Sequence, residues 1–282
     1  MAHDFSEKGE KILDTEFQVL DKGFVRLVDY MGSDSRIVQA ARVSYGEGTK
    51  SYREDKGLIN YLLRNEHTSP FEQVVFTFHV KLPIFVARQW VRHRTGRLNE
   101  ISGRYSIMKH EFYKPDAADI AYQSTDNKQG RSSDTEMPQH EKDAFLQSVE
   151  ESHKRAGKEY DTYIENGISR EIARINLPLS LYTEWYWQMD LHNLFHFLKL
   201  RMDPHAQLEI RRYAETIFSI IKNICPIACA AFEEHVLTSA KLSNKELSAV
   251  EILLNGGNHG LSEKELTRLK QKISTAGLSA ST

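Results

Sequence analysis

The sequence predicts an α+β fold, with a mixed sheet and flanking helices, because its hydrophobic periodicity changes several times along the chain. Apolar and polar residues alternate over 74–82 and 181–189, a pattern typical of strands with one buried face. Apolar residues over 145–164 and 191–198 instead recur at helical spacing, which predicts amphipathic helices. A further helix is expected over 52–64.

Capping and turn-forming residues set further boundaries. A first strand is expected at 24–30. Pro83 is predicted to open a helix that carries residues 88–93, since proline is accepted in a first turn. Asp190 is predicted to cap the helix that follows it, and Asp203-Pro204 to end that helix and cap a long final one.

The domain organisation is predicted as a main domain over 1–236 and a C-terminal extension over 237–282. Residues 114–143 form a polar insert, and a loop of such length in a compact domain is either a mobile lid or disordered. In the extension, Ser262-Glu-Lys-Glu265 is a capping box that would open a short helix. The extension is therefore expected to contain a small helical hairpin over 241–273.

The composition is that of a soluble globular protein, with 40% hydrophobic residues, 27% charged residues and a net charge of -2. No signal peptide or transmembrane run is evident, so a cytoplasmic protein without a membrane partner is expected. Cys225 and Cys229 stand among apolar residues and are interpreted as structural thiols. A metal or redox pair is the second interpretation, but further ligands of that type are lacking, and no metal site is expected.

Five arginines and a single glutamate lie within residues 88–104, here called the arginine segment, although the whole chain is near charge balance. Arginine presents a planar fork of donors that fits a phosphate, so this segment predicts ordered recognition of an anion. Polar side chains that could orient a heterocycle lie among or beside the arginines: His93, Asn99, Ser102 and Tyr105. The alternative is a solvated helix face followed by a basic loop.

Arg201 falls on a helix face where leucine is expected, two turns after Leu194. A cation at such a position is costly unless an anion or a polar partner meets it. An internal salt bridge is one alternative, and an arginine that satisfies carbonyls at the helix C-terminus is another. His192 and His196 stand four residues apart on the same helix and could ligate a metal, but no acidic continuation of a metal motif follows.

Neither a Rossmann nor a P-loop fingerprint is present. Gly46-Glu-Gly48 lacks the third glycine, and Gly48-Thr-Lys-Ser51 lacks the upstream glycine, so both are interpreted as loop. A dinucleotide cofactor would therefore be held by side chains, and the arginine segment could do this.

Arg92-His-Arg, followed by seven residues and Ser102-Gly-Arg-Tyr-Ser106, resembles the signature motif of the flavin-dependent thymidylate synthases, the ThyX type. The resemblance covers roughly residues 20–235 and is highly specific, because other segments match in the family's order. Those segments are 41–44, 67–72, 83–90, 173–179 and 197–207.

The resemblance implies a ThyX-type fold with an added C-terminal helical tail, and a homotetramer with shared active sites. It implies methylation of dUMP to dTMP, with 5,10-methylenetetrahydrofolate as carbon donor and with FAD reduced by NADPH, without a covalent enzyme nucleophile. The residues that match the dUMP-binding set are Gln89, Arg92, Glu100, Ser102, Gly103, Arg104, Arg174 and Arg201. The residues that match flavin contacts are Ser69, Arg92, His93, Arg94, Glu100, Asp190, His192 and His196. His67 and Ser44 match positions near the folate and flavin entrance.

Two of these positions match catalytic roles. Arg201 matches the arginine that promotes ionisation at the pyrimidine N3, and Ser102 matches a serine near the reacting carbon. Asp190 departs from the family's frequent asparagine, and an ionised aspartate cannot donate a hydrogen bond. Ser69 stands where threonine is common, which keeps a hydroxyl group.

Two other classes of function compete with this interpretation. A nucleic-acid-binding module would explain arginines near Trp90 and Tyr105, but the pI of about 6.6 is far from the basic balance of such a module. A metal-dependent hydrolase would use His192, His196 and His205. The absorbance spectrum of the purified protein discriminates among the three, because only the synthase would carry flavin bands.

Overall fold

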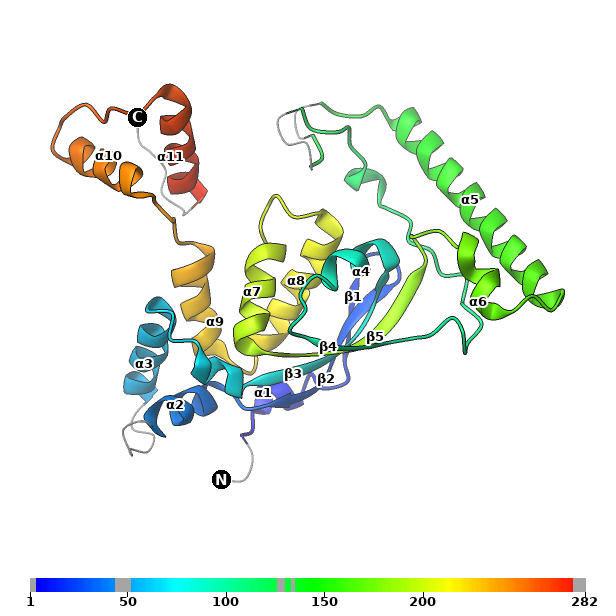
Figure 1. The fold of residues 1–282 in the computed structure, drawn as a ribbon, viewed down its shortest axis with the longest axis horizontal. Coiled ribbons are helices and arrows are strands. Elements are labelled where there is room, and N and C mark those ends of the chain that lie inside the picture. The colour runs from blue at the N-terminus through cyan, green and yellow to red at the C-terminus, as the bar shows by residue number, and fades with distance from the viewer. Residues whose placement is uncertain (1–3, 44–51, 126–129, 133–134, 276–282) are drawn as a thin grey trace.

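A five-stranded sheet forms the centre of the protein in the computed structural model, which describes residues 4–43, 52–125, 130–132 and 135–275. The strands, in the sheet order β1-β2-β3-β5-β4, are β1 Glu16–Val19, β2 Gly23–Met31, β3 Val75–Pro83, β5 Tyr182–Asp190 and β4 Arg97–Glu100. The predicted α+β class is confirmed. Every pairing is antiparallel, however, so the expectation of a mixed sheet is wrong. The helices between β2 and β3 lie beyond the end of the sheet, and β3 therefore returns beside β2 in the opposite direction (Figure 1).

The helices differ widely in length. They are α1 Glu7–Glu10, α2 Asp34–Arg42, α3 Tyr52–Arg64, α4 Ile84–Trp90, α5 Gln139–Glu165, α6 Arg170–Ala173, α7 Leu191–Arg201, α8 Leu208–Ile221, α9 Pro226–Phe232, α10 Asn244–Leu254 and α11 Glu263–Thr275. Short turns of other helix types lie at η2 Ser69–Gln73, η3 Ala117–Asp119, η4 Arg174–Asn176 and η5 Glu233–Leu237. None of the helices in the described ranges has the length and hydrophobicity needed to cross a membrane.

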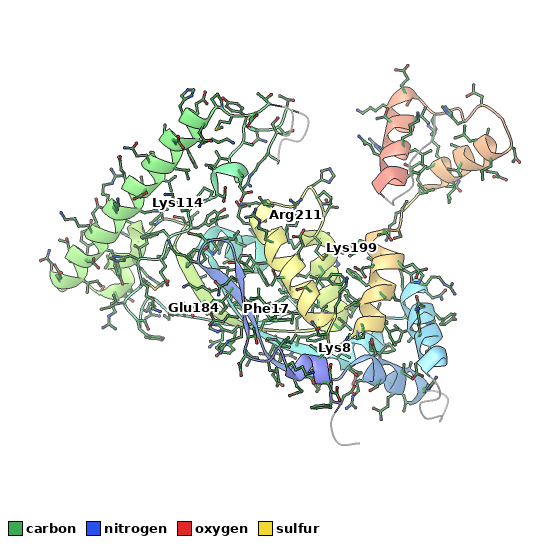
Figure 2. The ribbon with its side chains drawn as sticks, turned by 180° about the vertical axis from the view of Figure 1, so that it is seen from behind. Lys8, Phe17, Lys114, Glu184, Lys199 and Arg211 are labelled. Atoms are coloured by element: carbon green, nitrogen blue, oxygen red, sulfur yellow. The ribbon has the colours of Figure 1, made fainter. Side chains whose placement is uncertain are left out.

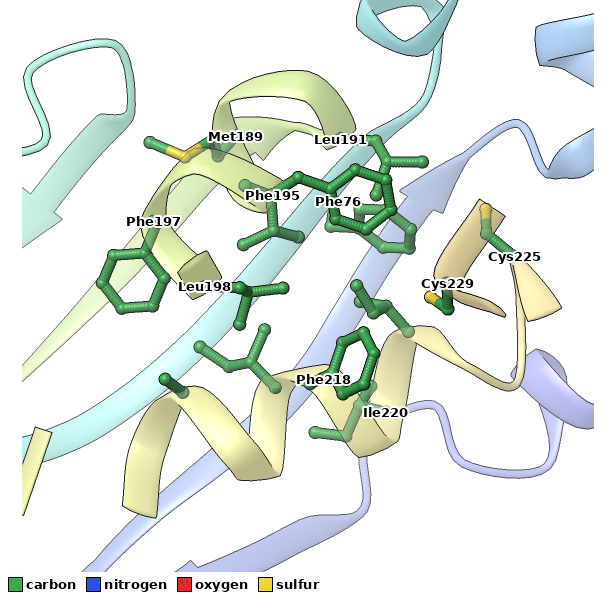
Figure 3. Packing of buried hydrophobic residues seen from close by; sticks show 14 of the residues in the cluster. Phe76, Met189, Leu191, Phe195, Phe197, Leu198, Phe218, Ile220, Cys225 and Cys229 are labelled. Carbon is green, nitrogen blue, oxygen red and sulfur yellow. The ribbon is translucent and has the colours of Figure 1, made fainter. Parts of the chain in front are cut away.

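The main core lies between the sheet and helices α4, α7 and α8. Phe76, Phe78 and Val80 of β3 are fully buried, whereas the residues between them are only partly buried, as the alternation predicts. Trp90 of α4 packs against a buried tryptophan of β5, with 5.1 Å between its ring centroid and that of Trp187. Figure 3 shows the residues of α7 and α8 that meet in this core.

Two of the predicted helix boundaries need correction. Helix α4 ends at Trp90, so Arg92 and His93 lie in the turn after it and not on the helix. Helix α8 begins after Gln207 rather than at Asp203-Pro204, because the Asp203 carboxylate accepts the His205 N–H at 2.8 Å and closes a separate turn. The expected cap at Asp190 is confirmed, since its side chain accepts the Asn193 N–H at 2.9 Å.

The described part of the polar insert, which is predicted over 114–143 as a mobile lid or a disordered loop, contacts α8. The Asp119 carboxylate pairs with Arg212 at 2.9 Å, and Arg131 pairs with the buried Glu209. The last residues of the predicted insert, from Gln139, belong to α5. In Figure 2, insert residues run between α5, beside which Lys114 lies, and the end of α8 that carries Arg211.

The C-terminal extension contains the two expected helices, α10 and α11, which lie together at one side of the molecule (Figure 1). Lys272 bridges them by contacting Glu246 at 2.8 Å. Ala249 and Leu269 are buried, yet neither belongs to the hydrophobic clusters of the rest of the chain. The capping box at Ser262-Glu-Lys-Glu265 is confirmed by reciprocal hydrogen bonds.

Candidate functional site

The arginine segment runs from α4 through a turn into β4, an edge strand, and then into a second turn. Pairing of β4 with β5 sets Glu100 opposite Trp185, and the Glu100 carboxylate accepts the Thr183 hydroxyl at 2.5 Å. Beyond the strand, the Ser102 carbonyl accepts the N–H groups of Tyr105 and Ser106, each at 3.0 Å. Pairing with β5 therefore fixes the start of the loop that contains the predicted Ser102 and Gly103.

A second segment brings another arginine to this loop. A side chain at Gly103 would place its Cβ 3.1 Å from Arg174 Cδ and 3.0 Å from Met108 Sδ. A Cβ at this position would require both side chains to shift by a few tenths of an ångström, so Arg174 approaches the loop backbone closely. Arg104 lies near the same segment, with its Nε 3.4 Å from the carboxylate of Glu171. Two arginines that are far apart in sequence therefore border one loop, as the prediction required.

Arg201 ends α7 and has only neutral partners. Its Nε donates to His93 Nε2 at 3.1 Å, and its Nη2 donates to the Gln89 carbonyl at 3.3 Å. No ion pair within the described ranges includes this residue, and burial lowers the pKa of its guanidinium. The predicted alternative of an internal salt bridge therefore finds no support, and the carbonyl that Arg201 meets belongs to α4 rather than to its own helix.

His93 is a neutral acceptor at the pH of most cells. Burial, followed by the positive charge of Arg201 and the neighbouring His196, lowers its pKa to about 4. The uncharged ring can accept the Arg201 N–H at Nε2 and leaves a donor at Nδ1. The ring also packs edge-on against Phe197, with 4.9 Å between the centroids, and lies 6.0 Å from the His196 ring.

Helix α7 carries three of the predicted flavin residues: Asp190 at its N-cap, His192 in its first turn and His196 in its second half. Asp190 caps the helix and directs both of its carboxylate oxygens to Asn193, at 2.9 and 2.8 Å. His192 is partly buried and His196 is exposed on the same helix. Arg92 and Arg94 are exposed in the turn after α4, and neither forms an ion pair with another described residue. His93, in the turn after α4, thus meets His196 and Arg201 in the second half of α7, whereas Asp190 and His192 lie at the start of that helix.

The remaining predicted residues lie elsewhere around α7. Ser69 begins η2, which packs against α7, and it lines a cavity of about 540 Å³ with Arg36 and Val43. His67 packs edge-on against Tyr61, with 5.8 Å between the ring centroids. Ser44 falls outside the described residues. Among the residues that are described, no three His, Cys, Asp or Glu side chains gather as a metal site would require.

Gln207 contacts the predicted site residue Gln89, although the sequence did not identify Gln207 itself as a site residue. Its side-chain oxygen accepts a hydrogen bond from the Gln89 amide, across the gap between α4 and the first turn of α8. The signal was its place in His205-Ala-Gln207, a segment that contributed only to the family resemblance. Periodicity could not reveal this contact, because it joins residues that are far apart in sequence.

Comparisons with known proteins show the family of the chain. The Thy1 family, described as thymidylate synthase complementing protein, matches residues 26–227. A flavin-dependent thymidylate synthase of Treponema denticola is 62% identical over 261 residues, 93% of this chain and 98% of its own. One of Thermus thermophilus is 61% identical, over 84% of this chain and 85% of its own. A solved UMP/dUMP methylase, PolB of Streptomyces cacaoi bound with 5-Br dUMP, is 34% identical with a TM-score of 0.71, over 78% of this chain and 98% of its own.

The titration of His93 provides a test of this geometry. We expect its pKa to be about 4, and to rise partly toward the ordinary 6.5 in an Arg201→Gln variant, because burial is the largest cause of the shift and the charge of Arg201 the second. NMR titration of the histidine rings measures both values. A pKa near 6.5 in the parent protein, or one that the substitution leaves unchanged, would contradict the arrangement.

The same shift has a consequence for stability. The pKa of His93 is lower in the folded than in the unfolded chain, so the ring binds a proton more readily when the chain is unfolded. Above pH 6.5 the ring is neutral in both states, and the contribution of His93 to the free energy of unfolding has its full value. That contribution is lost as the pH falls from 6.5 through about 4.

Proposed function

The chain belongs to the flavin-dependent thymidylate synthases, and we propose that the arginine segment, Arg174 and Arg201 form its dUMP site. The enzyme makes dTMP from dUMP, with methylenetetrahydrofolate as carbon donor and with FAD that NADPH reduces. The proposed dUMP set is Gln89, Arg92, Glu100, Ser102, Gly103, Arg104, Arg174 and Arg201. The proposed flavin set is Ser69, Arg92, His93, Arg94, Glu100, Asp190, His192 and His196.

The loop around Gly103 is proposed to hold the phosphate of dUMP. Arg174 lies against the Gly103 backbone, and Arg104 extends from the next residue. Two guanidinium groups beside a turn can form charge-assisted hydrogen bonds to a phosphate. Ser102, on the same turn, would then stand near the pyrimidine, which agrees with its predicted place beside the reacting carbon.

The observation that carries the proposal is the partly buried Arg201 guanidinium, which has neutral partners. Stabilising the negative charge that develops on the O2/N3 edge of uracil would activate C5 for methylation. An arginine already paired with a carboxylate would contribute less, because its charge would be neutralised. Cys225 and Cys229 are buried, and burial raises the pKa of both thiols well above the ordinary value, so neither favours attack at C6.

The residues of the turn after α4 and of α7 fit FAD by the chemistry of their donors. Arg92 and Arg94 can neutralise its diphosphate, and neutral His93 can donate through Nδ1 while Arg201 occupies Nε2. Asp190 is proposed to act by capping α7, since Asn193 already engages both carboxylate oxygens. Bound FAD supplies the reducing equivalents of the reaction.

We propose that the enzyme is a homotetramer whose active sites are shared between subunits. Exposed apolar side chains border the proposed dUMP loop, which is the pattern of an interface rather than of a free surface. They are Ile101, Tyr105, Ile107, Ile172, Ile175 and Leu179. A second subunit over these residues would exclude water from the site. His67 and the segment that contains Ser44 are proposed to border the entrance for folate and flavin.

A charge at this surface tests the shared site. Leu179 is 62% exposed, and we expect Leu179→Glu to give smaller oligomers with less bound FAD, because the glutamate would have to be desolvated at the interface. Light scattering and flavin absorbance measure the two effects. Leu254→Glu, at an 83% exposed leucine of α10, is the matched control and should change neither. A parent protein that binds FAD fully as a monomer would contradict the proposal.

The C-terminal extension is proposed to lie outside the catalytic domain, as the predicted boundary implies. A chain that ends at Leu237 should keep most of its dTMP-forming activity, because Val236 and Leu237 still pack on the main core and α10 and α11 have their own interior. A chain that ends at Cys225 lacks buried α9 and should not fold. Circular dichroism and a dTMP assay compare the two chains. A folded but inactive protein ending at Leu237 would show that the catalytic domain extends into the C-terminal extension.

Replacement of Arg201 tests the activity itself. Arg201→Ala should retain FAD but form dTMP at least about 10²-fold more slowly, the scale of losing one preorganised donor to a developing anion. Arg201→Lys should recover only part of the rate, since a single ammonium cannot present two parallel donors. NADPH oxidation should be less affected than product formation. Lys199→Ala, a nearby cation on α7, is the control, and a parental rate of dTMP formation in Arg201→Ala would refute the assignment.

A further inference from the structure

A series of side-chain contacts connects the polar insert to Arg201. Arg131 pairs with Glu209 in the first turn of α8, and Gln207, the N-cap residue of that helix, lines the same cavity as Arg131 and Glu209. The Gln207 side chain accepts the amide of Gln89, and the Gln89 carbonyl accepts Nη2 of Arg201 at 3.3 Å. Arg131, Gln89 and Arg201 come from three separate segments of the chain, so their arrangement around the start of α8 depends on tertiary packing.

Glu209 is the member that depends most on its partner. The residue is only 2% exposed, and burial by itself would raise the pKa of its carboxyl group. Arg131 and the hydrogen bonds to Glu209 outweigh burial and hold that pKa below the ordinary value. The Tyr113 hydroxyl also donates to the carboxylate, at 3.2 Å. Among the ion pairs of the described residues, Arg131 is the cation that compensates this buried charge.

We propose that Arg131 is a positioning residue for Arg201, which acts through Glu209, Gln207 and Gln89. Without Arg131, the buried carboxylate of Glu209 would lack its cation. It would then attract the NH2 group of the Gln207 side chain or take up a proton. The Gln207 oxygen would then no longer hold Gln89, and the carbonyl that receives Arg201 would lose its fixed position. The inference rests on the proposed role of Arg201 in activating dUMP, and it gives the insert a part in turnover.

The insert provides its own control, because a second ion pair ties it to α8. Arg212 pairs with Asp119 at 2.9 Å, but none of its described contacts reaches Gln207. Arg212→Gln should therefore loosen the insert as much as Arg131→Gln does, while it leaves the contacts to Gln89 intact. A difference between the two variants separates positioning of Arg201 from simple anchoring of the insert.

The experiment compares both variants as full-length, FAD-loaded enzyme. Arg131→Gln should lower kcat for dTMP about 10-fold or more, since small misplacement of a catalytic group has effects of this size. The KM for dUMP and the FAD content should change less, and NADPH oxidation should be largely retained. Arg212→Gln should keep kcat within about twofold. Equal losses of kcat in the two variants, or no loss in Arg131→Gln, would overturn the inference.

Chemical rescue makes the test independent of folding. Arg131 and Gln207 line a cavity of about 420 Å³, so guanidinium can enter the space that Arg131→Ala opens. Millimolar guanidinium should restore part of the lost kcat of that variant, whereas sodium at equal ionic strength should not. Absence of any rescue in a folded, FAD-loaded Arg131→Ala protein would count against the inference. If Arg201→Ala were fully active, the proposed function itself would fail, which is a distinguishable result.

Discussion

The packing of Trp90 between the sheet and α7 is the contact on which the site depends. Its ring lies 5.6 and 5.1 Å from those of Trp185 and Trp187, and 4.8 Å from that of Phe197. Aromatic groups in such edge-on and tilted arrangements contribute large buried areas and fixed orientations. Because Trp90 is the last residue of α4 and Phe197 lies within α7, this cluster sets the distance between the two helices. It thereby brings His93 and the Gln89 carbonyl to Arg201.

Burial also has a cost in this cluster. The Nε1 groups of Trp90 and Trp185 are buried without a hydrogen-bond partner among the described residues. An unsatisfied buried donor costs on the order of 1–3 kcal/mol, so the aromatic packing must outweigh two such losses. The same low-polarity surroundings lower the pKa values of His93 and Arg201. Stability and function therefore depend on one environment, in which a neutral histidine and a partly buried guanidinium meet.

The arginines in and around the site differ in the groups that their guanidinium groups contact. Arg104 contacts Glu171, and Arg131 compensates Glu209, so these charges are balanced within the protein. Arg201 instead meets an imidazole and a carbonyl, which orient the guanidinium without neutralising it. A preorganised donor of this kind stabilises charge that develops during a reaction, because it does not have to reorient as the charge forms. Arg201 is therefore a cation that its described partners leave unneutralised, in a chain whose net charge is -2.

The local sequence determined much of the fold, and its motifs predicted most residues of the proposed site. The alternation over 74–82 and 181–189 identified the two central strands, because the period of side chains in a strand is a local property. Asp190 was recognisable as a helix cap for the same reason. The order of motifs along the chain indicated the family, which the comparisons confirm.

Tertiary structure decided what the local pattern leaves open. The direction of each strand, the neutral partners of Arg201 and the approach of Arg174 to Gly103 all join residues that are far apart in sequence. The same holds for Gln207 and for the insert, whose composition indicated a loop but not that Arg131 would pair with the buried Glu209. Periodicity reports which face of an element is buried. Only packing determines what that face meets, because the partner is set by the path of the whole chain.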